Sequence, residues 1–430
     1  SRAAKPDIQI KRGRPMSLIV QKFGGSSVKD NRRIRHVAGI IERTYKAGND
    51  VIVVLSAQGD TTDDLVVRAQ DINPRPSNRE MDMLLSVGEQ ISVSLCAMEL
   101  ERRGLRCVSL AGWQAGVQTS SVYGEARIKR IDPERIQSEL DQRRIVLVAG
   151  FQGIDRVGNV TTLGRGGSDT SAVALAAAFH ASLCQIYTDV DGVYTTDPRV
   201  VPNARKLGEI TYDEMLELAS QGAQVLHNRS VELAKKFHVN LEVVSSLEDK
   251  PGTSIKEVTK VEKTNIAGVA KDSSIARIAL VGLQNNPGVA FQVFDLLSKS
   301  NINVDVILQS IGREDTKDIT FTVHKKDVDA SVELLEEHKE ALQFDHINTD
   351  GHIGKVSIVG MGLMSNCGVA AKMFEALYDA GINIQMINTS EIRVSVLLDE
   401  APSTRSSSTR PEQRPRRFCS GPPAHRVAGR

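Results

Sequence analysis

A lysine followed by two glycines near the start of the chain has the residue types of a phosphate-binding turn. In QKFGGSSV, Lys22 ends an apolar run, and Gly24 and Gly25 follow it. Glycines let backbone N–H groups approach a phosphate closely, a helix start favours anions, and a lysine adds positive charge. A purely structural turn has the same residues, so this segment alone is not decisive. The sequence G-x-x-x-x-G-K-[ST] does not occur, which excludes the P-loop class.

A second glycine pair lies in TTLGRGGSDTSAV, directly before a run of small residues with helical character. The guanidinium of Arg165, beside Gly166 and Gly167, suits bidentate binding of a carboxylate, and the backbone N–H groups of a helix start can hold another anion. Taken singly, Ser168 or Asp169 is equally well explained as the N-cap of that helix.

A third polar segment, YTDVDGVYTTDPR, follows an apolar run and contains several acids. Its spacing lacks the twelve-residue loop and terminal glutamate of an EF-hand, so a calcium loop is not expected. Loops at the ends of parallel strands are where ligands usually bind in α/β proteins. The segment is therefore a candidate binding loop.

The three polar segments lie between apolar runs that alternate with helical patterns, so the elements formed by these runs determine where the segments lie. Strands that are apolar on both faces and separated by helices indicate a mostly parallel sheet. We predict an α/β domain at 16–250, with a mostly parallel central sheet and helices on both faces. The strand-like runs are 18–23, 51–56, 145–151, 184–190 and 241–246.

An internal repeat organises the second half of the chain. NPGVAFQVFDLLSKSNINVDVILQS at 286–310 aligns with NCGVAAKMFEALYDAGINIQMINTS at 366–390 without gaps. Each copy has a strand, helix, strand, strand pattern, and the first continues with a helix and a strand, as in a ferredoxin-like α+β unit. We predict two such units, at 262–347 and 352–398. The second is incomplete, and we expect it to keep an unpaired sheet edge and an exposed apolar face.

Both ends of the chain are basic. Residues 1–15 carry five Lys or Arg and one acid, and we interpret them as an extension. Residues 399–430 are rich in Pro, Ser and Arg and cannot bury enough apolar surface to offset their ordering entropy. We predict a disordered tail that comes from a frameshifted or miscalled gene end; a basic interaction tail is the alternative.

Composition narrows the function classes. Without its two ends the chain has more acids than bases, which argues against nucleic acid or an anionic membrane as a partner. No apolar run reaches the about 18 residues of a membrane span. The five cysteines show no C-x-x-C or His-paired spacing, so we expect a cytoplasmic protein without a protein-bound metal.

Together these segments resemble the aspartate kinases of the amino acid kinase family. KFGGSS, SAQGDTTD, MLLSVGEQIS, TTLGRGGSDTSA and TDVDGVYTTDPR all match that family's pattern, and the repeat resembles its paired ACT domains. The resemblance implies ATP-dependent phosphorylation of the side-chain carboxylate of L-aspartate, an early step toward lysine, threonine and methionine. A carboxylate is already a nucleophile, so this chemistry needs positioning and charge stabilisation rather than a general base.

The resemblance also implies a role for each matching residue. Lys22 and Asp169 would be catalytic, with Asp169 organising the lysine and the Mg²⁺ carried on ATP. Glu89 would bind the substrate ammonium and Arg165 its α-carboxylate, although a solvated helix acid is the default explanation of Glu89 without the resemblance. The implied substrate-binding residues are Thr61, Thr62, Glu89, Arg165, Gly166, Gly167 and Ser168. The implied nucleotide-binding residues are Lys22, Phe23, Gly24, Gly25, Ser56, Thr188, Asp189, Val193, Tyr194, Thr195, Thr196, Asp197 and Pro198.

By the same resemblance, the ACT units would bind lysine or threonine as effectors and join copies into a homo- or hetero-oligomer. The implied effector-binding residues are Asn285, Asn286, Pro287, Gly288, Val289, Ala290, Gln309, Asn383 and Ile384. A simple turn is the alternative for Asn286–Gly288. Two other functions stay open: a family member that acts on a glutamate-type substrate, and a catalytically silent amino-acid sensor.

Overall fold

The structure is a computed structural model, and it describes most of the chain between its two ends. The predicted basic extension at 1–15 and residues 401–430 of the predicted tail lie outside the described residues. The described residues are 17–223, 225–257, 266–311, 316–361, 363 and 368–400.

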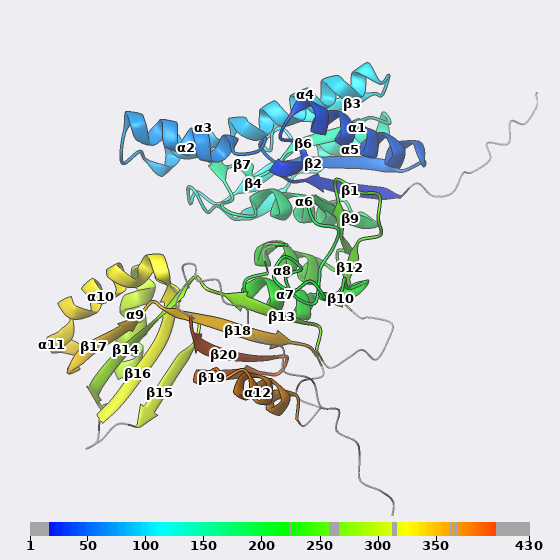
Figure 1. Ribbon diagram of the computed structural model, residues 1–430. Helices are drawn as coiled ribbons and strands as arrows, with labels where there is room; N and C mark the ends of the chain where they lie inside the picture. The colour runs from blue at the N-terminus through cyan, green and yellow to red at the C-terminus, as the bar shows by residue number, and fades with distance from the viewer. Residues whose placement is uncertain are drawn as a thin grey trace, which may run out of the picture. The chain divides into compact units, whose positions relative to one another are not determined.

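An eight-stranded sheet forms the centre of the first part of the chain, as predicted (Figure 1). Neighbouring strands are parallel except for β11 and β12, which are antiparallel. All five predicted strand-like runs are strands of this sheet. In sheet order the strands are β10 (Glu209–Thr211), β12 (Thr253–Lys256), β11 (Leu241–Ser245), β9 (Leu183–Thr188), β1 (Leu18–Phe23), β2 (Asp50–Leu55), β6 (Ile145–Ala149) and β3 (Cys107–Leu110).

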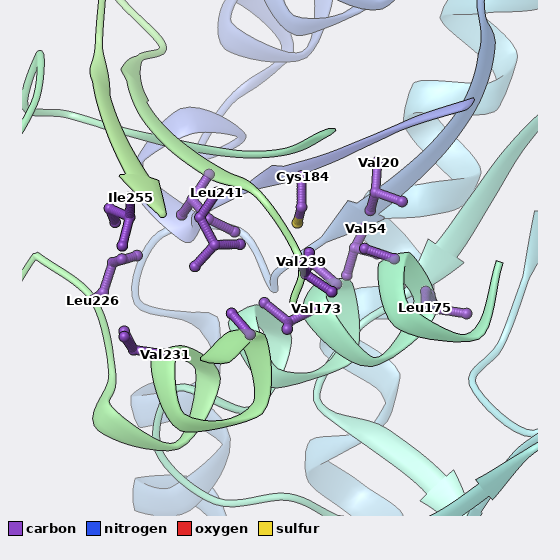
Figure 2. Packing of buried hydrophobic residues seen from close by; sticks show 14 of the residues in the cluster. Val20, Val54, Val173, Leu175, Cys184, Leu226, Val231, Val239, Leu241 and Ile255 are labelled. Atoms are coloured by element: carbon purple, nitrogen blue, oxygen red, sulfur yellow. The ribbon is translucent and has the colours of Figure 1, made fainter. Parts of the chain in front are cut away.

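Two hydrophobic clusters cover the two faces of this sheet. Along β2, Val51, Val53 and Leu55 belong to one cluster, whereas Ile52 and Val54 belong to the other, as the alternation of strand side chains requires. Helices α1 (Asn31–Lys46) and α4 (Val87–Arg102) complete the first cluster. Figure 2 shows part of the second cluster, which contains residues of α5 (Glu134–Asp141), α6 (Gly167–Ala178), α7 (Tyr212–Ser220) and α8 (Asn228–Phe237).

A smaller sheet and two further helices complete the first part. Its strands, in sheet order, are β5 (Ile128–Ile131), β4 (Val117–Thr119), β7 (Gln152–Ile154) and β8 (Val160–Thr162). Helix α3 (Asn78–Leu85) packs against β8, and α2 (Thr61–Ile72) packs against α3. The helical stretch Asn78–Arg102 is long and apolar enough to cross a membrane by length and composition, but half of it is buried inside the protein, as in a core helix.

The first repeat unit has the predicted βαββαβ order. Its core joins β14, β16, α9 and α10 through buried residues that include Ile278, Phe321, Val293 and Leu335. The elements are β14 (Ile275–Gln284), α9 (Val289–Lys299), β15 (Ile307–Ile311), β16 (Thr316–His324), η2 (Lys325–Asp327), α10 (Val328–Glu337), α11 (Lys339–Leu342) and β17 (His346–Asp350).

The second unit contains a strand that the sequence did not predict. The expected unpaired edge is wrong, because β13 pairs antiparallel with β18 (Figure 1). This strand lies within the bounds predicted for the first unit, 262–347, but belongs to the sheet of the second unit. This strand occupies the position that β17 holds beside β14 in the first unit. An apolar groove of about 480 Å³ does remain beside α12, lined by Val269, Ile358 and Met373 among others. The elements are β13 (Gly268–Asp272), β18 (Ile353–Val359), α12 (Val369–Asp379), β19 (Ile384–Ser390) and β20 (Arg393–Asp399).

Candidate active site

A cavity of about 910 Å³ lies at the carboxyl ends of β1 and β2, beside the first turn of α6. This is the position at which parallel α/β sheets bind ligands. The structure brings most of the predicted substrate and phosphate residues to this one cavity. The predicted residues that line it are Lys22, Gly25, Ser56, Thr62, Glu89, Arg165, Gly166, Gly167, Ser168 and Asp169.

Lys22 and Asp169 form an ion pair within the cavity wall. Lys22 lies near the end of β1, Asp169 lies in the first turn of α6, and their side chains are 2.6 Å apart. Both side chains are mostly buried, at 11% and 12% exposed. A mostly buried ammonium that keeps one carboxylate partner is available to a phosphate group that enters the cavity.

The Gly24–Gly25 turn brings backbone close to backbone beside Lys22. A Cβ atom on Gly25 would lie 2.8 Å from the carbonyl oxygen of Ala57, so the position has no room for a side chain. The turn leads into a short 3-10 helix, η1 (Gly25–Ser27). Phe23 does not face the cavity: its ring is fully buried and stacks on Tyr187 with centroids 4.5 Å apart, so only its backbone could take part in binding.

Glu89 is buried, which excludes a solvated helix acid. It is 3% exposed, and its Oε1 accepts a hydrogen bond from the N–H of Ala57 at 3.1 Å. The second oxygen, Oε2, is buried without a hydrogen-bond partner among the described residues. Burial raises the pKa of the Glu89 carboxyl to about 7. A carboxylate in this position gains from a cationic group of a ligand.

The segment before α6 presents Arg165 and Ser168 to the cavity. Gly166, with φ +65°, is the N-cap residue of α6 and makes no side-chain cap, so Ser168 and Asp169 lie inside the first turn and are not N-caps. A Cβ atom on Gly166 would lie 2.3 Å from the Cβ of His227, so only glycine fits. Arg165 is exposed, and Ser168 is buried.

The two threonines at the start of α2 differ. The hydroxyl of Thr61 donates to the carbonyl of Gln58 at 2.6 Å and so forms part of the local turn. Thr62 lines the cavity. Of the two threonines predicted to bind substrate, only Thr62 borders the cavity, and the substrate role of both stays a prediction.

The predicted nucleotide loop follows β9, next to β1, but its residues are not among those that line the cavity. Tyr194 donates to Asp191 at 2.8 Å, and Lys206 pairs with Asp191 at 3.2 Å. Arg199 pairs with Asp197 and holds the pKa of that carboxyl below its ordinary value. The loop residues from the prediction are Thr188, Asp189, Val193, Tyr194, Thr195, Thr196, Asp197 and Pro198.

The predicted effector residues occupy one turn and two strands. Gly288, with φ +93°, is the N-cap residue of α9, directly after the turn from β14. Gln309 lies on β15, while Ile384 is the first residue of β19 in the other sheet and Asn383 directly precedes it. These positions do not by themselves define a binding site, and the effector role stays a prediction.

Sequence reasoning missed several residues of the cavity. Asp82 on α3 is 1% exposed, and His227 and Arg229 lie at the start of α8. Asp82 directly precedes the motif MLLSVGEQIS, whereas His227 and Arg229 lie outside all the quoted motifs. No residue-type pattern at these positions predicts that they line the cavity.

Comparison with known proteins gives the family of this chain. The family model described as "Amino acid kinase family" matches residues 17–245, and an ACT domain model matches 278–338 and 356–406. An aspartokinase of Bacillus sp. (strain MGA3) is 51% identical over 387 residues, which cover 90% of this chain and 94% of the relative. The chain therefore belongs to the amino acid kinase family.

Solved structures show which group of enzymes within this family the chain resembles. A structure of E. coli aspartokinase III in complex with aspartate and ADP (R-state) is 27% identical, covers 89% of this chain and 96% of its own, and has a TM-score of 0.77. The complex of the same enzyme with lysine and aspartate (T-state), also 27% identical with the same coverage, has a TM-score of 0.70. Within the family, the chain is an enzyme of the aspartokinase group.

Proposed function

We propose that the chain transfers the terminal phosphoryl group of ATP to the side-chain carboxylate of L-aspartate, which yields 4-phospho-L-aspartate and ADP. The observation that carries the proposal is the convergence of Lys22, Glu89 and Arg165 on one cavity. The ammonium of Lys22 matches a phosphate of ATP. The buried carboxylate of Glu89 matches the ammonium of aspartate, and the guanidinium of Arg165 matches its α-carboxylate. The aspartate and ADP bound to E. coli aspartokinase III support this assignment.

In this mechanism the residues position two anions and stabilise charge. Lys22 and the N–H group of Gly25 bind the phosphates, because the N–H of Gly24 already donates to the carbonyl of Tyr187 at 3.2 Å. Thr62 and Ser168 hold the reacting carboxylate. Because that carboxylate is itself the nucleophile, the protein needs no general base and no covalent intermediate. Positive charge fixed beside the transferred phosphoryl group stabilises the negative charge that develops there.

ATP enters as its magnesium complex, and the donor chemistry of the cavity fits that ion. Asp169, beside Lys22, would hold the ion through its carboxylate oxygens, the ligand type that Mg²⁺ prefers. When bound, Mg²⁺ neutralises phosphate charge. The nucleotide base and ribose then extend toward the loop after β9, where Thr188, Tyr194 and Asp197 lie.

The test is ADP release by the purified chain with MgATP and L-aspartate, L-glutamate or no acceptor, together with hydroxylamine trapping of the acyl phosphate. ADP and hydroxamate should form with aspartate alone. Equal ADP release in all three reactions would overturn the proposal. Preference for glutamate would favour the glutamate-type alternative, and no ADP release would favour a silent sensor.

The regulatory proposal is separate. Lysine or threonine binds at the turn Asn285–Ala290 and slows catalysis in a cytoplasmic oligomer. Gln309, in the middle of β15, and Asn383 and Ile384, where β19 begins, contribute to the site. The lysine complex of E. coli aspartokinase III supports lysine as the first candidate. Gly288→Asp should weaken inhibition. Gly351→Asp, at a glycine outside the predicted site that, like Gly288, has nothing within 4 Å of an added Cβ atom, should not. Unchanged inhibition of the Gly288 variant by both amino acids would count against this site.

A further inference from the structure

A buried carboxylate outside the predicted site holds two segments of the cavity wall together. Both side-chain oxygens of Asp82 accept from the N–H of Gly124 at 3.0 Å. Its Oδ2 also accepts from the N–H of Thr162 at 2.8 Å, and its Oδ1 from the hydroxyl of Thr162 at 2.6 Å. All of these donors are neutral, so the carboxylate of Asp82 pairs with N–H and O–H groups and not with a cation.

A guanidinium from a different helix holds the same two segments through their carbonyl groups. Arg229, at the start of α8, donates from Nη1 to the carbonyl of Leu163 at 2.9 Å and from Nη2 to that of Ala126 at 2.7 Å. The two segments also bond to each other, because the N–H of Ala126 donates to the carbonyl of Thr162 at 2.9 Å. The segments 124–126 and 162–163 are therefore held from two sides. The carboxylate of Asp82 binds their N–H groups, and the guanidinium of Arg229 binds their carbonyl groups.

The segment that Asp82 and Arg229 hold leads directly into the predicted substrate-binding residues. Leu163 is followed by Gly164, where an added Cβ atom would lie 3.0 Å from the carbonyl oxygen of Gly124. Arg165 comes next and Ser168 three residues later, both at the cavity. A long, exposed arginine side chain can bind a carboxylate tightly only if its backbone starts from a fixed place, because freedom of that backbone would lower the population of the binding geometry.

We propose that Asp82 and Arg229 are positioning residues for the acceptor substrate: they fix the backbone from which Arg165 and Ser168 reach the substrate carboxylates. The proposal rests on the role of Arg165 in the proposed function. Neither residue contacts the reacting atoms in this scheme. Their loss acts on the binding of aspartate more than on the binding of ATP, whose phosphates are bound by Lys22 and the Gly24–Gly25 turn.

Two substitutions test the proposal through the KM values for the two substrates. In Asp82→Asn only one oxygen remains to accept hydrogen bonds. The N–H of Gly124 therefore loses one of its two acceptors, and either the N–H or the hydroxyl of Thr162 loses its acceptor. In Arg229→Lys a single ammonium replaces the two-pronged contact to Ala126 and Leu163. Each variant should raise the KM for aspartate about tenfold or more and leave the KM for ATP within about twofold.

The charge change alone predicts the opposite result for Asp82→Asn. Removal of a negative charge from the cavity wall would favour an anionic acceptor and lower its KM. A lower KM for aspartate would therefore overturn the positioning role.

A double-mutant comparison with Arg165→Met links the effect to the residue that is positioned. If Asp82 acts through Arg165, Asp82→Asn should add less than about twofold to the KM for aspartate in the Arg165→Met background. The proposal would be overturned if the KM for aspartate in the double variant equalled the product of the two single-variant increases. It would also be overturned if Asp82→Asn alone raised the KM values for aspartate and ATP equally. If Arg165→Met itself leaves the KM for aspartate unchanged, the role of Arg165 in the proposed function fails, and this proposal fails with it.

Two further variants control for loss of folding. Glu139→Gln changes another buried acid, which lies on α5 and pairs with Arg135 and Arg144, and should lower the melting temperature without changing either KM. If Asp82→Asn does not fold, Thr162→Val removes only the hydroxyl donor and should raise the KM for aspartate about threefold. An unchanged KM in that variant would then count as the contrary result.

Discussion

The ammonium nitrogen of Lys22 lies 2.6 Å from a carboxylate oxygen of Asp169, although the two residues come from distant parts of the chain. The parallel sheet explains this proximity. Lys22 lies near the carboxyl end of β1, and α6, which begins beside that end, packs its buried face on β1 and β2. The ion pair thus links the strand that leads into the Gly24–Gly25 turn to helix α6.

Replacement of this lysine should reduce turnover rather than aspartate binding. Lys22→Met removes fixed positive charge from the site of phosphoryl transfer, and we expect kcat to fall by about 10² to 10³. The KM for aspartate should change little, because Glu89 and Arg165 are unaffected. Steady-state kinetics with both substrates varied would measure this.

The matched control is Lys235→Met on the outer side of α8. Lys235 also forms an ion pair, with Asp213 at 2.5 Å, but it is about half exposed. Its replacement should leave kcat within about twofold, since exposed ion pairs contribute little. Similar losses in both variants would contradict a specific role for Lys22.

Aspartate use should depend on pH through Glu89. Its pKa is raised to about 7, and only the ionised form attracts the substrate ammonium. We therefore expect kcat/KM for aspartate to rise as the pH increases from 6 to 8 and then level off, since this parameter follows the free enzyme. In Glu89→Gln the rise in this window should disappear. A pH profile that is identical in the variant would exclude Glu89 as the titrating group.

The same carboxyl should lower stability at neutral pH. Because its folded pKa lies above its unfolded value of 4.5, its contribution is fully present below pH 4.5 and is lost as the pH rises through about 7. Glu89→Gln should therefore match the wild type at pH 4 and exceed its free energy of unfolding at pH 8, by on the order of 3 kcal/mol. Urea unfolding at both pH values measures the difference. An equal difference at the two values would rule out the buried-acid explanation.

The sequence predicted the central sheet well because its signal is local. Runs such as VIVVLS are apolar on both faces, and their register follows from burial. The short strand β13 (Gly268–Asp272) has no comparable pattern, and its partner β18 lies far along the chain. Only tertiary pairing makes it a strand, so the unpaired edge was predicted wrongly.

The residues of the candidate site also fall into two groups, those that a local sequence pattern predicts and those that only the folded structure reveals. Lys22 and Arg165 stand in glycine-containing motifs that limit the chemistry they can perform. Asp82 and Arg229 act through hydrogen bonds to the backbone of remote segments, and a backbone partner leaves no residue-type signal in the sequence. Glu89 is intermediate, because its burial, which determines its pKa, appears only in the folded protein.

Substrate analogues should separate the roles of Arg165 and Glu89. β-Alanine lacks the α-carboxylate of aspartate, and succinate lacks the ammonium. Arg165→Met should reduce the preference for aspartate over β-alanine by about tenfold or more, because the lost charge-assisted contact concerns only aspartate. Glu89→Gln should reduce the preference over succinate instead. Competition assays that gave the same change for both variants would contradict this division of roles.

Gly166 should be intolerant of even the smallest side chain. In Gly166→Ala a left-handed backbone conformation, φ +65°, would carry a Cβ atom, and that atom would lie 2.3 Å from the Cβ of His227. Gly48→Ala provides the matched control, because Gly48 also has a positive φ, +94°, but nothing within 4 Å of the added atom. We expect the control to lose about 1 to 2 kcal/mol of stability through backbone strain and to keep its KM values. Gly166→Ala should lose more stability and also raise the KM for aspartate, since either His227 or the segment carrying Arg165 must move. Equal stability and unchanged kinetics in the two variants would show that the contact with His227 does not constrain this segment.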